Sequence, residues 1–300
     1  MKILITGSNG LLGQKMVSDL KGDTSVELIA TSRGENRLKD KTGYSYFSLD
    51  ITSNDEVQAC MNQFKPDVIV NTAAMTNVDV CEKDKDGCDQ LNVEAVKHLI
   101  SACETHNTHL VHLSTDFIFD GEDGPYPEDA KPNPLSYYGL SKLKAENLIQ
   151  DSSISSSILR TVLVYGVAEE MSRSNIVLWA KGALEKGQAM NVVDDQFRTP
   201  TLAEDLSKGC IAAAKLKAQG VFNISGDNYL SVLEIIEGVA DFWKLSKDNI
   251  TVVSSTTLNQ DAKRPPRTGF VLDKAKKELN YKPHSFKEGL AIVDSQLSAN

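Results

Sequence analysis

The chain has 300 residues and a mass of 32.8 kDa, which suits a large domain with an appendage or two domains. Hydrophobic residues make up 41% and charged residues 24%, so the composition is that of a globular protein rather than a disordered one. The net charge of −9 excludes a broad basic face for nucleic acid, and no apolar run is long enough to span a membrane.

Short apolar runs alternate with helix-length segments through the first half of the chain. The expected strands are 2–6, 26–30, 46–49, 68–71, 110–113 and 158–164. The expected helices are 11–20, 53–64, 87–105 and 138–150. Because the runs are continuously apolar, they predict an α/β fold of the Rossmann type, with a doubly wound parallel sheet covered on both faces.

The rhythm of the sequence changes after residue 166. Helical stretches dominate there, with strands expected near 190–193 and 221–224, and a serine-rich run at 152–157 is expected to be a hydrophilic turn. The predicted dinucleotide-binding domain therefore comprises 1–166 and about 199–224. A smaller, mostly helical substrate domain comprises about 167–198 and 225–300.

The N-terminal run and the cysteines indicate a compartment. The apolar run that follows Lys2 is broken by Gly7 and is too short for a signal peptide. The five cysteines are an odd number without a Cys-x-x-Cys pair, so buried reduced thiols are expected. His109 and His112 would face opposite sides of a strand, which argues against a metal site. Together these features predict a cytoplasmic protein without a metal.

A glycine-rich turn is the first chemical signal. Thr6-Gly-Ser-Asn-Gly-Leu-Leu-Gly13 follows the first expected strand and begins the first expected helix. Gly7 permits the tight turn, Gly10 lets a pyrophosphate approach the backbone, and Gly13 lets the helix pack close to the sheet. The helix N-terminus supplies free N–H groups and a positive dipole end. The turn predicts a dinucleotide site, with a purely structural turn as the alternative.

The end of the second expected strand bears on the choice of cofactor. An NAD site carries an acidic residue there for the ribose 2′-hydroxyl, whereas this chain has Ser32 and Arg33. These two residues suit a 2′-phosphate through hydrogen bonds and charge. The sequence therefore predicts NADP(H). NAD(H) is the alternative, in which Arg33 is a solvated surface residue and Glu35 or another group accepts the ribose.

Two further strand ends add weaker signals. Asp50 and Ile51 would place a carboxylate near the adenine amino group. The small residues of Asn71-Thr-Ala-Ala74 would let the backbone pass the cofactor ribose. Each pattern is equally compatible with a structural role.

A tyrosine and a lysine one helical turn apart form the second chemical signal. Tyr138 and Lys142 would share one face of a helix, although an ordinary surface pair has the same spacing. A free tyrosine has a pKa of about 10, and a neighbouring ammonium is expected to lower it. The pair follows Ser114 and Thr115 at the C-terminal end of an expected strand, where doubly wound sheets bind ligands. Thr115 or Ser114 would orient a substrate oxygen toward Tyr138.

Together these features resemble the extended short-chain dehydrogenase/reductase family, and within it the dTDP-4-dehydrorhamnose reductase subgroup. The resemblance covers nearly the whole chain. It is carried by the glycine turn, Asn71-Thr-Ala-Ala-Met-Thr-Asn-Val-Asp79, Ser114-Thr-Asp-Phe-Ile-Phe-Asp-Gly121, the Tyr138-Gly-Leu-Ser-Lys142 segment and Val192-Val-Asp-Asp-Gln-Phe-Arg-Thr-Pro-Thr201. The third and fifth of these segments are fairly specific to the subgroup, whereas the glycine turn and the Tyr/Lys pair are shared by the superfamily.

The resemblance implies NADPH-dependent reduction of the 4-keto group of a nucleotide-diphosphate sugar in dTDP-rhamnose biosynthesis, with Thr115, Tyr138 and Lys142 as catalytic residues. From the residues and the resemblance together, the predicted cofactor contacts are Gly7, Asn9, Gly10, Leu11, Leu12, Gly13, Ser32, Arg33, Asp50, Ile51, Ala73, Ala74, Met75 and Asn92. The predicted substrate contacts are Thr76, Val78, Asp116, Asn175, Gln196, Arg198 and Arg264. The family often carries glycine where Arg198 stands. A homodimer is the candidate assembly.

Other functions stay open at this point. A sugar-nucleotide 4-epimerase uses the same Tyr/Lys chemistry on a retained cofactor. A dehydratase would need an Asp-Glu pair after the threonine, but here Asp116 is followed by Phe117. The regulatory subunit of methionine adenosyltransferase resembles the family and is a non-catalytic binding partner, although the intact catalytic set argues against that role.

Overall fold

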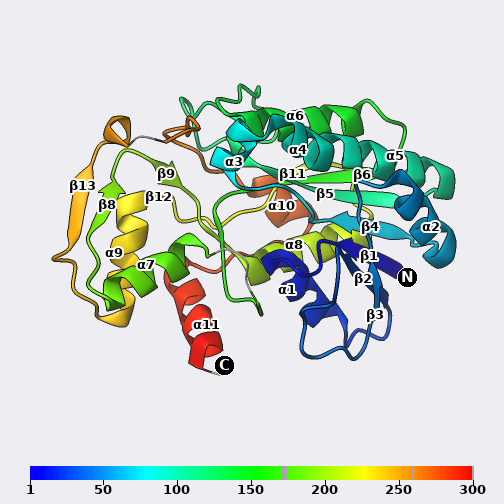
Figure 1. The fold of residues 1–300 in the computed structure, drawn as a ribbon, viewed down its shortest axis with the longest axis horizontal. Coiled ribbons are helices and arrows are strands. Elements are labelled where there is room, and N and C mark those ends of the chain that lie inside the picture. The colour runs from blue at the N-terminus through cyan, green and yellow to red at the C-terminus, as the bar shows by residue number, and fades with distance from the viewer. Residues whose placement is uncertain (171–173, 259, 299–300) are drawn as a thin grey trace.

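The computed structural model describes residues 1–170, 174–258 and 260–298 (Figure 1). Within them lies one sheet of seven strands, in the order β11-β6-β5-β4-β1-β2-β3, and each neighbouring pair is parallel. The strands are β1 (Lys2–Thr6), β2 (Glu27–Ser32), β3 (Ser45–Ser48), β4 (Val68–Asn71), β5 (His109–Thr115), β6 (Ser156–Thr161) and β11 (Gly220–Asn223). The predicted Rossmann-type fold is confirmed.

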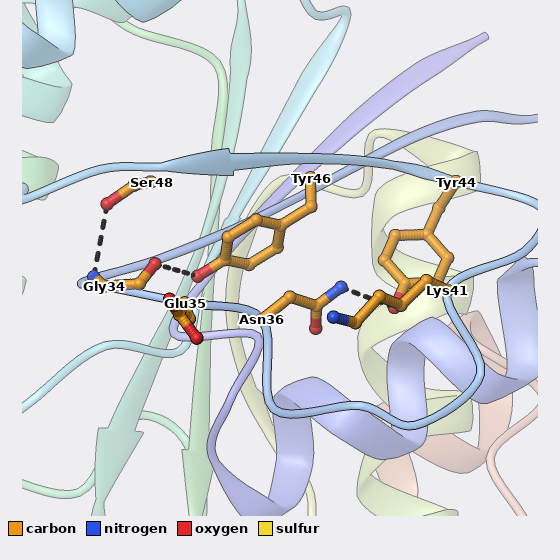
Figure 2. Close-up of a pocket in the computed structure, with 7 residues that line it drawn as sticks. All are labelled: Gly34, Glu35, Asn36, Lys41, Tyr44, Tyr46 and Ser48. Carbon is orange, nitrogen blue, oxygen red and sulfur yellow. Dashed lines mark hydrogen bonds between the residues drawn. The ribbon is translucent and has the colours of Figure 1, made fainter.

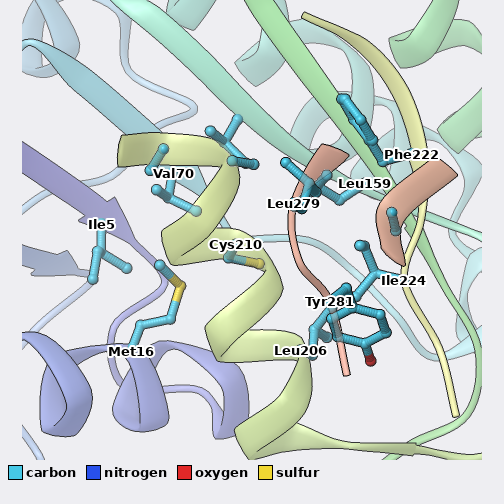
Figure 3. Close-up of a cluster of buried hydrophobic side chains, with 14 of the residues drawn as sticks. Ile5, Met16, Val70, Leu159, Leu206, Cys210, Phe222, Ile224, Leu279 and Tyr281 are labelled. Carbon is cyan, nitrogen blue, oxygen red and sulfur yellow. The ribbon is translucent and has the colours of Figure 1, made fainter. Parts of the chain in front are cut away.

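Helices cover both faces of this sheet. They are α1 (Leu11–Leu20), α2 (Asn54–Phe64), α3 (Val78–Lys83), α4 (Lys85–Asp89), the π-helix η1 (Gln90–Glu94), α5 (Ala95–His106), the 3-10 helix η2 (Asp116–Ile118), α6 (Tyr137–Gln150), α8 (Ala203–Leu216) and α10 (Asp273–Glu278). On one face α1, α8 and α10 enclose a core that includes Ile5, Met16 and Cys210 (Figure 3). On the other face α2, α5 and α6 pack on Leu4 and Ile69. Apolar strands are thus buried on both sides, as the continuous runs predict.

The remaining elements build a smaller lobe with its own core. They are β7 (Val164–Tyr165), α7 (Ile176–Glu185), β8 (Met190–Val193), β9 (Phe197–Arg198), β10 (Thr201–Leu202), β12 (Leu230–Ser231), α9 (Val232–Trp243), β13 (Ile250–Val253), η3 (Ser255–Thr257) and α11 (Phe286–Ser298). Tyr165, Ile235 and Phe286 are buried together at its centre. This second core fits the predicted two-domain division, which stays a prediction. Among the described residues, no helix combines the length and apolar character needed to cross a bilayer.

Two local predictions were wrong, and a third was incomplete. The run 158–164 is divided between β6 and β7, because Leu163 adopts a φ of 41° and turns the chain out of the large sheet. The serine-rich run is a turn only in part, since β6 begins at Ser156 and Ser157 is buried. The expected helix 87–105 is α4, η1 and α5 in succession, and α3 before it was not predicted.

Candidate active site

The glycine turn closes against its own backbone. Gly7 has a φ of 68°, a conformation that favours glycine. The Gly10 N–H donates to the carbonyl oxygen of Gly7 at 2.9 Å. A Cβ added at Gly13 would lie 2.4 Å from the Gly7 oxygen, so only glycine lets α1 approach the turn this closely. The predicted roles of Gly7 and Gly13 in shaping the turn therefore have a steric basis.

The surroundings of this turn fit a dinucleotide phosphate. The first N–H groups of a helix lack intrahelical partners, and the first turn of α1 holds no acidic side chain that would repel an anion. Within the described residues the buried Ser8 Oγ also has no hydrogen-bond partner. Leu11 and Leu12 are partly exposed at the start of α1. By contrast, Asn9 uses its side chain to hold the 35–37 loop, through the Glu35 oxygen and the Arg37 N–H.

The ends of β2 and β3 place the predicted adenosine contacts together. Ser32 ends β2, and the Arg33 side chain that follows is 70% exposed and lies 3.9 Å from Asp50 Oδ2. Asp50 and the buried Ile51 follow β3 at the same edge of the sheet. No acidic residue ends β2, so the ribose hydroxyl partner typical of NAD sites is missing from that position.

A cavity of about 550 Å³ lies beside this edge, under the loop that follows Arg33. Figure 2 shows how the loop is tied to β3: the Tyr46 hydroxyl donates to the Gly34 oxygen at 2.8 Å, and the Gly34 N–H donates to Ser48 Oγ at 3.2 Å. The cavity is lined by Gly34, Glu35, Asn36, Lys41, Tyr44, Tyr46 and Ser48. Lys41 contributes a cation to this lining, which also contains the acidic Glu35.

Asn92 fixes the segment that follows β4. Its carboxamide accepts from the Met75 N–H at 2.8 Å and donates to the Met75 oxygen at 3.0 Å, and it also donates to Ser141 Oγ on α6. Ala73 and Ala74 in this segment are partly buried, as is Met75. The predicted cofactor contacts after β4 are therefore held against the helix that carries the candidate catalytic pair.

The packing of α6 brings the three candidate catalytic residues together. Ser136 caps the helix, accepting from the Gly139 N–H at 3.2 Å, and a Cβ at Gly139 would lie 2.1 Å from the Phe117 oxygen. The helix therefore sits directly on η2, next to the end of β5. There the Thr115 and Tyr138 hydroxyls lie near enough to each other for Thr115 to lower the Tyr138 pKa. Ser114, the other candidate from the sequence, has a buried Oγ without a partner in the described part of the chain.

Burial dominates the electrostatics of the pair on α6. Tyr138 is 9% exposed, and its burial raises its pKa above the ordinary value, although the nearby Thr115 hydroxyl acts in the opposite direction. The expectation of a lowered tyrosine pKa is therefore wrong for the protein without ligands. Lys142 is 3% exposed, and burial lowers its pKa to about 8 against the opposing effects of Glu146 and Cys88. At neutral pH the site holds a phenol and an ammonium.

Three of the predicted substrate contacts, Asp116, Gln196 and Arg198, are buried. Asp116 accepts from Thr115 Oγ1 at 3.1 Å and from Thr268 Oγ1, and burial raises its pKa. Arg198 lies 3.9 Å from Asp116 and donates to the Pro265 oxygen at 2.8 Å. Gln196 is also buried. Asp116 and Arg198 are thus committed to protein partners, and sequence reasoning missed the partnership of Asp116 with Thr268.

The other predicted substrate contacts lie nearer to solvent. Asn175 caps α7 and donates to the Gly166 oxygen at 2.7 Å. Arg264 donates to Asp79 Oδ2 at 2.6 Å in a partly exposed ion pair, so the 264–267 segment is not a free surface loop. Thr76 is exposed, and Val78 begins α3 and packs against the cluster that contains Tyr138. Their roles stay predictions.

The fold and this site define a Rossmann-type protein of the extended short-chain dehydrogenase/reductase class. The family described as RmlD substrate binding domain matches residues 1–298, and the chain belongs to this family.

Two solved structures and one curated protein show the range of its relatives. A dTDP-4-dehydrorhamnose reductase of Clostridium acetobutylicum has a TM-score of 0.87 and 30% identity, covering 99% of this chain and 100% of that one. The same enzyme of Bacillus anthracis, in complex with NADP, has a TM-score of 0.84 and 25% identity over 98% and 99%. Methionine adenosyltransferase 2 subunit beta of Danio rerio is 28% identical over 269 residues, which is 88% of this chain and 80% of that protein.

Proposed function

We propose that the protein reduces the 4-keto group of a nucleotide-diphosphate sugar with NADPH, as a dTDP-4-dehydrorhamnose reductase does. The observation that carries this proposal is the meeting of Thr115, Tyr138 and Lys142 at the sheet edge where the glycine turn also lies. The similarity to reductases of Clostridium acetobutylicum and Bacillus anthracis supports it.

The candidate catalytic residues divide the work of carbonyl reduction. A bound nicotinamide dinucleotide supplies the hydride chemistry. The Thr115 hydroxyl binds the substrate carbonyl oxygen and orients it toward Tyr138. Because its pKa is raised, Tyr138 is a phenol at neutral pH and donates its proton to the forming alkoxide. The Lys142 ammonium holds the cofactor ribose and stabilises the phenolate left after proton transfer.

The preference for NADPH over NADH is assigned to Arg33. Its exposed guanidinium suits a 2′-phosphate, since arginine forms paired hydrogen bonds with phosphate oxygens. The remaining cofactor would be held by Gly7 to Gly13, Ser32, Asp50, Ile51, Met75 and the two alanines before it. Of the two arginines predicted for the sugar diphosphate, Arg264 is the more exposed, whereas Arg198 and Asp116 support the site from within.

The proposal is tested by following NADPH oxidation with a panel of 4-keto nucleotide sugars and identifying the product by NMR. Stoichiometric NADPH consumption with formation of the 4-hydroxy sugar supports it. A parallel panel of 4-hydroxy nucleotide sugars tests the alternative, because conversion of one C4 epimer into the other without net cofactor consumption would instead identify a 4-epimerase. Absence of turnover with every sugar in the panel would contradict the reductase.

A non-catalytic subunit is the second candidate function. It is favoured by the 28% identity to methionine adenosyltransferase 2 subunit beta of Danio rerio. In that case the protein would bind a methionine adenosyltransferase catalytic subunit in size-exclusion chromatography and would not oxidise NADPH with any keto sugar. The homodimer and the cytoplasmic location stay predictions.

A further inference from the structure

Lys142 is the first of four buried side chains that contact one another in a row across the sheet. Its Nζ lies 3.1 Å from His112 Nε2, and both residues are buried. On the other side of the imidazole, His112 Nδ1 lies 3.1 Å from the carboxamide of Asn71. That carboxamide in turn contacts Thr6 Oγ1 at 2.6 Å. The chain therefore links α6 to β5, β4 and β1 in succession.

Counting donors and acceptors in this row of side chains leaves one protonation state for the His112 ring. An ammonium has three donors and no acceptor, so Lys142 must donate to His112 Nε2, which therefore carries no proton. Burial and the adjacent Lys142 hold the pKa of His112 well below its ordinary value, so the ring is neutral and its single proton is on Nδ1. This N–H needs an acceptor, and the residue that faces it is Asn71.

The orientation of the Asn71 amide follows from this count. Its oxygen faces His112 Nδ1 and its NH2 group faces Thr6 Oγ1, which is the reverse of the placement that puts Nδ2 beside the ring. The two ends of a carboxamide have the same shape, so the proton inventory decides between them. The 3.1 Å contact with His112 suits an N–H···O bond, whereas the 2.6 Å contact with Thr6 is short for one, so the Thr6 hydroxyl must move away by a few tenths of an ångström.

We propose that His112 is a positioning residue for Lys142: held as the Nδ1–H tautomer by Asn71, it accepts one ammonium hydrogen and directs the other two toward the cofactor. The part that concerns the cofactor rests on the proposed function, whereas the tautomer and the contact with Lys142 do not. The other groups close enough to affect the charge of Lys142 are Glu146 on its own helix and Cys88 on α4.

The tautomer is tested by ¹⁵N NMR of the intact protein labelled on histidine. We expect a neutral His112 ring, protonated on Nδ1, between pH 6 and 7, where Lys142 is an ammonium. Replacing Lys142 by Met should move the Nε2 resonance toward that of a nitrogen without a hydrogen bond. The control Lys144→Met, on the same helix but paired with Asp89, should leave it in place. A ring protonated on Nε2 or on both nitrogens would overturn the proposal.

Cofactor affinity tests the positioning role. In His112→Gln a side-chain oxygen replaces the Nε2 acceptor, whereas His112→Leu removes it. We expect the leucine variant to bind NADPH about tenfold more weakly, the effect of losing a hydrogen bond to a charged group, and the glutamine variant to stay within about threefold of the wild type. The control His109→Gln is at the first residue of β5 and contacts Ser155 and Ser157 instead of Lys142, so it should bind NADPH as the wild type does.

The outcomes separate the two proposals. Wild-type affinity in a folded His112→Leu variant would refute the positioning role. If the wild type itself does not bind NADPH, the proposed function fails, while the NMR measurement still decides the tautomer and the contact with Lys142. If the leucine variant does not fold, the NMR comparison of wild type with Lys142→Met carries the test.

Discussion

Arg160 binds both carboxylate oxygens of Glu146 beneath the candidate active site. Its Nε donates to Oε1 at 3.1 Å and its Nη2 donates to Oε2 at 2.7 Å, and both side chains are buried. Glu146 lies one helical turn beyond Lys142, and Arg160 is on β6. The pair therefore anchors α6, which carries the candidate catalytic residues Tyr138 and Lys142, to the neighbouring strand.

Removing the charge of Glu146 should strongly destabilise the fold. In Glu146→Gln the buried guanidinium loses its counter-charge, which costs about 3–5 kcal/mol of unfolding free energy. Urea denaturation measures this loss. The control Glu185→Gln removes a partner of Lys181 from a surface pair and should cost less than about 1 kcal/mol. Equal losses in the two variants would contradict the structural role of the buried pair.

Gly13→Ala should damage the glycine turn. The added methyl group would lie 2.4 Å from the Gly7 oxygen, so α1 must move, and we expect a loss of about 1–3 kcal/mol together with weaker NADPH binding. Gly22→Ala is the matched control, because no atom lies within 4 Å of its added Cβ. Thermal unfolding and NADPH titration measure both effects. Unchanged NADPH affinity in a folded Gly13→Ala variant would separate the turn from cofactor binding.

Tyr138→Phe should abolish most of the turnover and spare the cofactor. Without the phenol, no side chain donates the proton, and we expect a loss of at least about 100-fold in kcat with NADPH affinity near that of the wild type. Its neighbour Tyr137 donates to Asp89 at 2.8 Å, so Tyr137→Phe is a control that should retain activity. Steady-state kinetics on the sugar identified by the substrate panel measure both. Retained turnover in Tyr138→Phe would remove this residue from the proposed role.

Arg33→Ala should weaken NADPH much more than NADH. Only NADPH carries the 2′-phosphate that the guanidinium would bind, and a lost charge-assisted hydrogen bond corresponds to roughly 10-fold or more in Kd. Fluorescence titration with the two cofactors provides the comparison within one variant. Equal weakening of both would defeat the assignment of Arg33 to the phosphate.

His109 should make the fold sensitive to acid. Its two ring nitrogens contact Ser155 and Ser157, and burial, helped by the charge of Lys217, lowers its pKa to about 4. Between pH 6.5 and 4 the unfolded chain takes up a proton that folded His109 does not, so its contribution to stability is lost as the pH falls through that window. The loss amounts to about 3 kcal/mol.

The contribution of His109 is measured as the difference in unfolding free energy between the wild type and a His109 variant. His112 also keeps a low pKa and contributes to the same acid loss, so the wild type alone does not isolate His109. Unfolding free energies of the wild type and His109→Gln from pH 7 to 4 give the difference. If the difference in unfolding free energy stayed constant from pH 7 to 4, His109 would not be a source of the acid sensitivity.

The sequence predicts the elements and strand ends well, because these depend on local patterns. Gly7 follows an apolar run, and Tyr138 and Lys142 are one turn apart on α6, so the glycine turn and the shared helix face could be predicted. The raised pKa of Tyr138 could not, since the spacing shows the neighbouring ammonium but not the burial that outweighs it.

Long-range pairing explains the other gaps. Asp116 binds Thr268, 152 residues further along the chain, and no periodicity connects these two positions. The contact of His112 with Lys142 could have been predicted from the sequence. Alternation along β5 places His112 on the same face as Leu110, and this face packs beneath α5 and α6, the helix that carries Lys142. The spacing of His109 and His112 by itself raises only the question of a metal site, which the sequence argues against.

The position of the outer strand β11 affects how the protein folds while it is being synthesised. It pairs with β6 but is encoded roughly 60 residues later, so a growing chain leaves the β6 edge uncovered for several seconds at translation rates of about 5–20 residues per second. An uncovered edge is a template for pairing with other chains. Truncated products that stop before residue 220 keep this edge permanently, and they should aggregate where the full-length chain does not.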